Sequence, residues 1–259
     1  EESSKFCIGL QVNQYESEAI AELFAEKGYE IVGIDEEADV YVINTCTVTN
    51  FGDKKSRQLI RKVKRQNENA IVAVVGCYAQ TAPKELMEIA GVNLVIGTKD
   101  RAQIVEMVEQ YDRANGVENH VSDIMKERVF EPHSIQKLAN RTRAYLKIQD
   151  GCSQYCSYCI IPYARGPIRS REPQEVVAEV KRLAENGFKE VVLTGIHVAS
   201  YGKDRRDTSL LDILKQVHEV EGIERIRFSS IEPNVVTEEF AQTMAALPKV
   251  CDHFHLSLQ

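Results

Sequence analysis

Residues 144–159 have the sequence AYLKIQDGCSQYCSYC, in which a short apolar segment, Tyr145–Ile148, is followed by three cysteines. The spacing Cys152-x3-Cys156-x2-Cys159 puts three thiolates on one tight loop. Three thiolates can hold three irons of a [4Fe–4S] cube, which leaves the fourth iron open to a small molecule. We therefore predict an iron–sulfur site with one open coordination position on this loop.

Two other interpretations of the loop are possible. A structural zinc site requires four ligands, usually in closely spaced pairs, and the loop contains no fourth cysteine or histidine. Buried structural cysteines rarely cluster so tightly. The chain has seven cysteines, an odd number and too few for a disulfide scaffold of 259 residues. This pattern favours metal binding in a reducing compartment and predicts a cytoplasmic protein.

Strands and helices alternate from residue 144 onward, with a repeat that is typical of successive βα units of a barrel. The predicted strands are Tyr145–Ile148, Glu190–Leu193, Arg225–Ser229 and His253–Leu256, and the predicted helices are Pro173–Asn186, Ser209–Val220 and Thr237–Ala246. The cysteine loop then follows the first barrel strand at its carboxyl end. Four units make only part of a barrel and leave an open edge, so we expect a truncated barrel whose remainder lies beyond Gln259.

The first hundred residues also alternate between the two element types, which predicts an α/β fold with a doubly wound parallel sheet. The predicted strands are Phe6–Gly9, Val40–Ile43, Ile71–Val75 and Asn93–Ile96, and the predicted helices are Ser17–Lys27, Asp53–Gln66, Pro83–Ile89 and Arg101–Tyr111. We expect an N-terminal domain over residues 1–112. A polar linker over 113–140 follows, with one strand near Val129–Phe130, and the partial barrel covers 141–259.

The amino-acid composition excludes some classes of binding partner. The net charge of −7 excludes a polycation, and no apolar run is long enough to span a membrane, so no membrane partner is expected. A basic segment nevertheless runs from Lys54 to Arg65 without an acidic residue. Its members at helical spacing share one face, which predicts a phosphate-binding stripe or, alternatively, an ordinary solvated helix face: Lys54, Arg57, Arg61 and Lys64.

The order Cys-x-x-x-Cys-x-aromatic-Cys, with Tyr158 as the aromatic residue, resembles the signature of the radical S-adenosylmethionine (SAM) superfamily. The resemblance implies that SAM chelates the open iron through its amino and carboxylate groups and is cleaved there. It also implies SAM contacts from the backbone near Tyr158 and Ile160 and from Gly195. Further positions that commonly face SAM follow the third and fourth strands: Ser229, Ser230, Glu232, His255 and Gln259.

Longer sequence motifs indicate a particular family within this superfamily. Residues 39–49 (DVYVINTCTVT), 76–80 (GCYAQ), 97–101 (GTKDR) and 159–166 (CIIPYARG) resemble the radical SAM methylthiotransferases. The strings Thr194-Gly-Ile-His197 and Tyr201-Gly202 resemble the branch that acts on N6-threonylcarbamoyladenosine in tRNA. The resemblance implies that the adenosine beside the anticodon gains a methylthio group at C2, with one SAM methylating a sulfur and a second supplying the radical. Arg165, Arg169 and Arg171 then contact tRNA phosphates or, alternatively, pair with carboxylates.

Cys46 and Cys77 each follow a predicted strand of the first domain, so they can converge on one metal centre beyond the sheet. The family binds a second [4Fe–4S] cluster there with three cysteines, and these two match. Leu10 stands at the third position, and an alkyl side chain cannot ligate iron. Cys7 lies about 10 Å upstream on the opposite face of the strand. The chain thus departs from the family pattern at the second cluster.

The resemblance implies the tRNA anticodon loop, SAM and an electron donor such as flavodoxin or ferredoxin as partners. Three alternatives stay open: a methylthiotransferase for isopentenyladenosine in tRNA, one for an aspartate of a ribosomal protein, and a non-catalytic fragment that holds one cluster.

Overall fold

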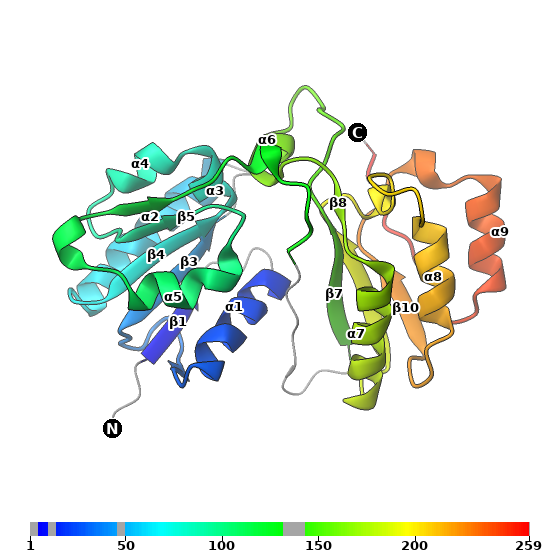
Figure 1. The fold of residues 1–259 in the computed structure, drawn as a ribbon, viewed down its shortest axis with the longest axis horizontal. Helices are drawn as coiled ribbons and strands as arrows, with labels where there is room; N and C mark the ends of the chain where they lie inside the picture. The colour runs from blue at the N-terminus through cyan, green and yellow to red at the C-terminus, as the bar shows by residue number, and fades with distance from the viewer. Residues whose placement is uncertain (1–4, 10–13, 46–49, 132–142, 259) are drawn as a thin grey trace. The chain divides into compact units, whose positions relative to one another are not determined.

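The computed structural model of the chain describes residues 5–9, 14–45, 50–131 and 143–258. The chain forms two compact units (Figure 1). Unit 1 consists of residues 1–127 together with 156–166, and unit 2 consists of residues 128–155 together with 167–259. The segment 156–166, which contains two of the three loop cysteines, therefore packs as part of unit 1.

Unit 1 contains a six-stranded sheet of order β2-β1-β3-β4-β5-β6, in which every neighbouring pair is parallel. Its strands are β1 (Lys5–Gly9), β2 (Glu30–Ile31), β3 (Val40–Thr45), β4 (Ile71–Gly76), β5 (Leu94–Ile96) and β6 (Glu118–His120). The helices of the unit are α1 (Gln14–Glu26), α2 (Asn50–Gln66), α3 (Cys77–Thr81), α4 (Pro83–Met87), α5 (Ile104–Glu109) and α6 (Ile161–Arg165).

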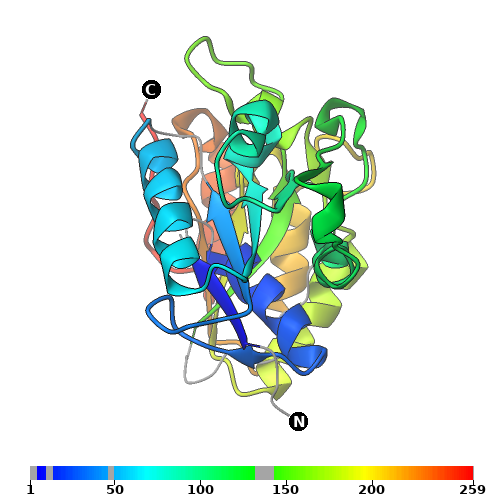
Figure 2. The same cartoon turned by 90° about the vertical axis from the view of Figure 1, so that its left-hand side faces the viewer.

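Helices cover both faces of this sheet, with α2 on one face and α1 and α5 on the other (Figure 2). The alternation of side chains along each strand explains the two layers. In β3, Tyr41 and Ile43 pack with α2, whereas Val40 and Val42 pack with α1 and α5. Both faces of the strands are buried, which is why their sequences are continuous apolar runs. The predicted doubly wound parallel sheet is confirmed.

The predicted linker covers residues 113–140, of which 132–140 lie outside the described residues. Glu118–His120 forms β6 and pairs with β5 at the edge of the sheet. Val129–Phe130, where a strand was expected, is not a strand in the structure, because it pairs with no other strand among the described residues. β6 has only three residues and no apolar run, so its β structure comes from pairing with β5 rather than from its own sequence.

Unit 2 contains a four-stranded sheet of order β10-β9-β7-β8, in which only β8 is antiparallel to its neighbour. Its strands are β7 (Arg143–Asp150), β8 (Arg169–Ser170), β9 (Glu190–Gly195) and β10 (Arg225–Phe228). The helices α7 (Pro173–Glu185), α8 (Leu210–His218) and α9 (Glu238–Ala246) join one apolar core with the strands. This is the predicted partial βα barrel, so the expected fold class is confirmed for both units.

Glu190 links three neighbouring strands of the unit 2 sheet through ion pairs and hydrogen bonds. Its carboxylate accepts hydrogen bonds from Arg225 Nε at 2.9 Å and Arg227 Nε at 2.8 Å, and it also pairs with Arg143. Burial alone would raise the pKa of Glu190, but these hydrogen bonds and the charge of Arg143 outweigh it and hold the pKa below its ordinary value. One carboxylate thus joins β7, β9 and β10.

The strand predicted at His253–Leu256 is wrong. Two isolated parallel bridges, Ile226 to Val250 and Ile231 to Leu256, replace it. Between them, His253 N donates to Cys251 O at 2.7 Å, which is a three-residue turn that interrupts an extended ladder. In the described ranges, no helix has both the length and the hydropathy needed to cross a membrane.

Candidate functional site

The cysteine loop leaves the carboxyl end of β7 and runs to α6, with Cys152, Cys156 and Cys159 each partly exposed. Its backbone turns at Tyr155, whose φ of 50° is left-handed, and Cys159 N donates to Cys156 O at 2.9 Å. Among the described residues, no group of three or more His, Cys, Asp or Glu side chains is gathered closely enough to hold a metal ion. The structure thus places the three predicted ligands along one partly exposed loop.

Gln149 controls how β7 enters this loop. Its side-chain Nε2 donates to the carbonyls of Asp150 at 2.7 Å and Gly151 at 2.6 Å, and its Oε1 accepts from His197 N at 2.8 Å. The residue is fully buried. Gly195 ends β9, and an added Cβ there would lie 2.7 Å from Gln149 Oε1 and 3.1 Å from Gln149 O, so a side chain at this position would disturb the contacts of Gln149. Gln149 was not predicted from the sequence, although a polar residue at the end of an apolar strand is the signal for it.

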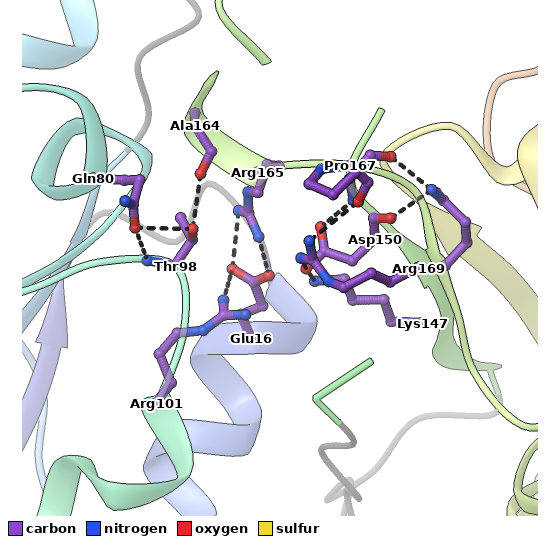
Figure 3. Close-up of polar contacts among 12 residues, drawn as sticks. Glu16, Gln80, Thr98, Arg101, Lys147, Asp150, Ala164, Arg165, Pro167 and Arg169 are labelled. Carbon is purple, nitrogen blue, oxygen red and sulfur yellow. Dashed lines mark hydrogen bonds and ion pairs between the residues drawn. The ribbon is translucent and has the colours of Figure 1, made fainter. Parts of the chain in front are cut away.

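A buried ion cluster lies directly before the loop (Figure 3). Lys147 Nζ is 2.8 Å from Asp150 Oδ2, and Arg169 Nη2 is 3.5 Å from the same oxygen. Asp150 Oδ1 also accepts from Gly151 N at 2.8 Å. Arg169 is 3% exposed. Its placement corresponds to the alternative of carboxylate pairing rather than to an exposed phosphate contact.

The carboxyl ends of β7, β9 and β10 meet at one edge of the unit 2 sheet because the three strands are parallel neighbours. The predicted SAM-facing residues of β9 and β10 lie at this edge. Ser230 Oγ is 2.7 Å from His255 Nδ1, and Glu232 Oε1 is 3.1 Å from His197 Nε2. His197 Nδ1 also contacts Ser200 Oγ. Gln259 lies outside the described residues.

Tyr158 and Ile160 are exposed, with 69% and 40% of their surface accessible. Gly195, Ser230, Glu232 and His255 are thus gathered around the strand ends, whereas Tyr158 and Ile160 project from the loop and its exit. Tyr158 and Ile160 are therefore available to contact SAM through their backbone atoms or their exposed side chains.

Cys77 is the first residue of α3 and is 4% exposed. Arg165 Nε donates to Cys77 Sγ at 3.1 Å, and its guanidinium also pairs with Glu16 (Figure 3). Glu16 in turn pairs with Arg101 Nη1 at 2.6 Å, and all three ion-paired residues are at most 4% exposed. Cys46 and Leu10, the other two positions of the second cluster, lie outside the described residues, and Cys7 lies in β1.

The predicted basic stripe on α2 is largely occupied by contacts within the protein. Arg57 Nη2 donates to Tyr78 Oη at 2.8 Å and pairs with Glu85 at 3.1 Å. Lys64 Nζ donates to the carbonyl of Ala70 at 2.7 Å. Burial, reinforced by the charge of Arg113, lowers the pKa of Lys64.

Arg61 is exposed, and it lines a pocket of about 320 Å³ with Arg57 and Glu85. The side chain of Lys54 is not described. Arg171, like Arg165, is buried and carboxylate-paired, with Glu179 as its partner.

Comparison with known proteins agrees with this geometry. Residues 6–97 match the family described as "Uncharacterized protein family UPF0004", and residues 146–259 match the radical SAM superfamily. The chain is 49% identical over 97% of its length to "Threonylcarbamoyladenosine tRNA methylthiotransferase MtaB" of Bacillus subtilis, and 40% identical to the protein of the same name from Aquifex aeolicus. A "tRNA-2-methylthio-N(6)-dimethylallyladenosine synthase" of Dictyoglomus thermophilum is 35% identical over 97% of the chain.

The chain covers 56%, 61% and 58% of these three relatives, respectively. Among solved structures, the radical SAM methyltransferase TsrM of Kitasatospora setae matches with a TM-score of 0.62 at 17% identity, over 94% of this chain and 57% of TsrM. This likeness supports the fold alone.

The partial βα barrel, with its three-cysteine loop at the carboxyl end of the first strand, defines the chain as a radical SAM protein. More narrowly, with a UPF0004 domain preceding the barrel, the chain belongs to the radical SAM methylthiotransferase family. Membership implies [4Fe–4S] clusters and SAM as cofactors.

Proposed function

We propose that this chain carries the UPF0004 and radical SAM parts of a methylthiotransferase that converts N6-threonylcarbamoyladenosine, beside the tRNA anticodon, to its 2-methylthio derivative. The main support for this proposal is the loop of Cys152, Cys156 and Cys159 after β7. It occurs in a chain that is 49% identical to a threonylcarbamoyladenosine tRNA methylthiotransferase. Relatives named for the dimethylallyladenosine reaction are less similar, at about 35% identity.

The donor set of the loop fits an open [4Fe–4S] cluster. Three thiols lie within eight residues on an accessible loop, which suits three irons and leaves one for the amino and carboxylate groups of SAM. When bound, the cluster supplies the one-electron chemistry that cleaves SAM, which is needed because an adenine C2–H bond is inert to acid–base chemistry.

The surrounding residues position these groups. Gln149 and Asp150 fix the backbone that leads into the loop, and Gly195 keeps the end of β9 free of a side chain. Ser230, Glu232 and His255 line the neighbouring strand ends and offer polar groups to SAM. Tyr158 and Ile160 are assigned to its adenine.

The second cluster is a different case. The sequence supplies Cys46 and Cys77 but Leu10 in place of the third thiol, so the three-cysteine set of the family is incomplete. We derive no step through this cluster. The tRNA contacts proposed for the α2 face are reduced to Arg61, together with Lys54, because Arg57 and Lys64 are engaged within the protein.

The test offers three substrates separately to the anaerobically reconstituted chain with SAM, a sulfide source and a chemical reductant. The substrates are an anticodon stem-loop with N6-threonylcarbamoyladenosine, the same stem-loop with isopentenyladenosine, and the ribosomal-protein substrate. Mass spectrometry is expected to find the methylthio group on the first alone. Modification of either other substrate in its place contradicts the assignment, and SAM cleavage without modification of any substrate favours the single-cluster fragment.

A further inference from the structure

Helix α6 is anchored rigidly on one face. Its first turn contains Pro162, which suits that position, and it ends at Arg165, followed by the cap residue Gly166 with a φ of 70° that favours glycine. Ala164 O accepts from Thr98 Oγ1 at 2.7 Å, and Gln80 Oε1 holds Thr98 through its backbone N at 3.0 Å (Figure 3). Ala164 is fully buried.

Arg165 strengthens this anchor, because its guanidinium bonds both oxygens of Glu16 and the sulfur of Cys77 inside unit 1. Charge-assisted, bidentate pairs of this kind give a fixed geometry as well as energy. The backbone of α6 is therefore fixed by α1, α3 and the segment around Thr98.

Part of α6 is exposed to solvent. Tyr163 is 57% exposed, although its neighbours Pro162 and Ala164 are buried. Four of the ten large apolar side chains that are exposed in the described ranges fall within residues 155–163: Tyr155, Tyr158, Ile160 and Tyr163. Exposed apolar side chains are thus concentrated in one short segment, on and just after the cysteine loop.

Tyr158 and Ile160 are already assigned to SAM, whereas no step of the proposed reaction uses Tyr163. Tyr163 N donates to Ile160 O at 3.0 Å, so the ring lies one turn beyond Ile160 and four residues beyond Cys159. A substrate that reaches the reactive iron must come to this loop. An aromatic side chain on a fixed backbone loses little freedom on binding and offers a face for a nucleobase.

We propose that Tyr163 is a substrate-positioning residue that stacks on a nucleobase flanking the target adenosine of the RNA. This inference rests on the proposed function and adds to it a contact on α6. The three tyrosines among the four exposed residues favour stacking on bases, which present flat faces in an unpaired loop. A protein surface at the same place is the competing occupant, and the test separates the two.

The absence of tryptophan from the sequence makes this contact directly observable. Tyr163→Trp introduces a unique fluorophore at the proposed contact, and Ile31→Trp introduces one at an exposed position on the edge strand β2 of the same unit. Both reconstituted variants are titrated with the modified anticodon stem-loop. Wild type, Tyr163→Phe and Tyr163→Ala are titrated in parallel by filter binding, which does not depend on the fluorophore.

The proposal predicts saturable quenching of the Tyr163→Trp emission and none for Ile31→Trp. It also predicts that Tyr163→Ala raises the Kd about tenfold, whereas Tyr163→Phe stays within about twofold of wild type. RNA that binds wild type and Tyr163→Ala equally, without quenching, overturns the stacking contact and leaves the proposed function standing. Quenching by the ribosomal-protein substrate but not by RNA overturns the choice of a nucleobase. RNA that does not bind wild type contradicts the proposed function as well.

Discussion

Substitution of Glu16 by Gln tests the buried cluster that anchors α6. The carboxylate is 1% exposed and lies between two buried guanidiniums, those of Arg101 and Arg165. The variant leaves both positive charges without their counter-charge in a site from which water is excluded. Breaking a buried pair costs about 3–5 kcal/mol, and we expect about 3 kcal/mol because the amide keeps one acceptor oxygen and the shape of the side chain.

The assay is urea unfolding of the whole chain, monitored by circular dichroism. At an m value of about 2 kcal/mol per molar urea, a loss of 3 kcal/mol lowers the midpoint by about 1.5 M. Glu26→Gln is the matched control, because Glu26 ends the same helix and is exposed, and it should change stability by less than about 0.5 kcal/mol.

The double variant Glu16→Gln/Arg101→Met removes one of the two guanidiniums together with the charge between them. It should therefore lose less stability than the sum of the single variants, by about 1 kcal/mol or more. A Glu16→Gln protein that unfolds within about 0.5 kcal/mol of wild type refutes the view that this cluster is a paired, buried anchor.

Three further predictions follow from the other contacts. The lowered pKa of Glu190 means that its carboxylate stabilises unit 2 at pH above about 4.5, and this stability is lost as the pH falls through the folded pKa, so Glu190→Gln should flatten the urea midpoint measured from pH 6 to pH 3. Ser209 Oγ accepts from Asp212 N at the start of α8, so Ser209→Ala should cost about 1 kcal/mol and Ser209→Asp much less, measured by urea unfolding. Leu10→Cys completes the family's second set of thiols, so anaerobic iron content should rise from about four to about eight per chain; an unchanged count contradicts the role given to Leu10.

The sequence was sufficient for the main architecture because both sheets are built from apolar runs that alternate with helical segments. Strands such as Val40–Thr45 and Ile71–Gly76 are buried on both faces, so their composition alone identifies them. The elements that were missed have two to five residues and are stabilised by their neighbours: β2, β6, β8, α3 and α6. Such short strands form because they pair with the edge of an existing sheet, and no local sequence pattern indicates that pairing.

Contacts between residues that are far apart in the sequence could not be predicted for the site. Three cysteines within one loop are visible as a pattern, whereas Glu16 and Arg165 are separated by 149 positions. One signal was nevertheless present. Glu16 lies at helical spacing from Ile20 and Phe24, on the face of α1 that enters the core, and a charged residue at such a position requires a partner.

The most direct test of the central claim measures iron content and 5′-deoxyadenosine formation in anaerobically reconstituted wild type and Cys156→Ala. Ser153→Ala serves as a control within the same loop. An open cluster on this loop predicts SAM cleavage by wild type and by Ser153→Ala, and none by Cys156→Ala, whose iron content should fall. Equal 5′-deoxyadenosine formation by Cys156→Ala, or zinc in place of iron at the wild-type loop, contradicts the account.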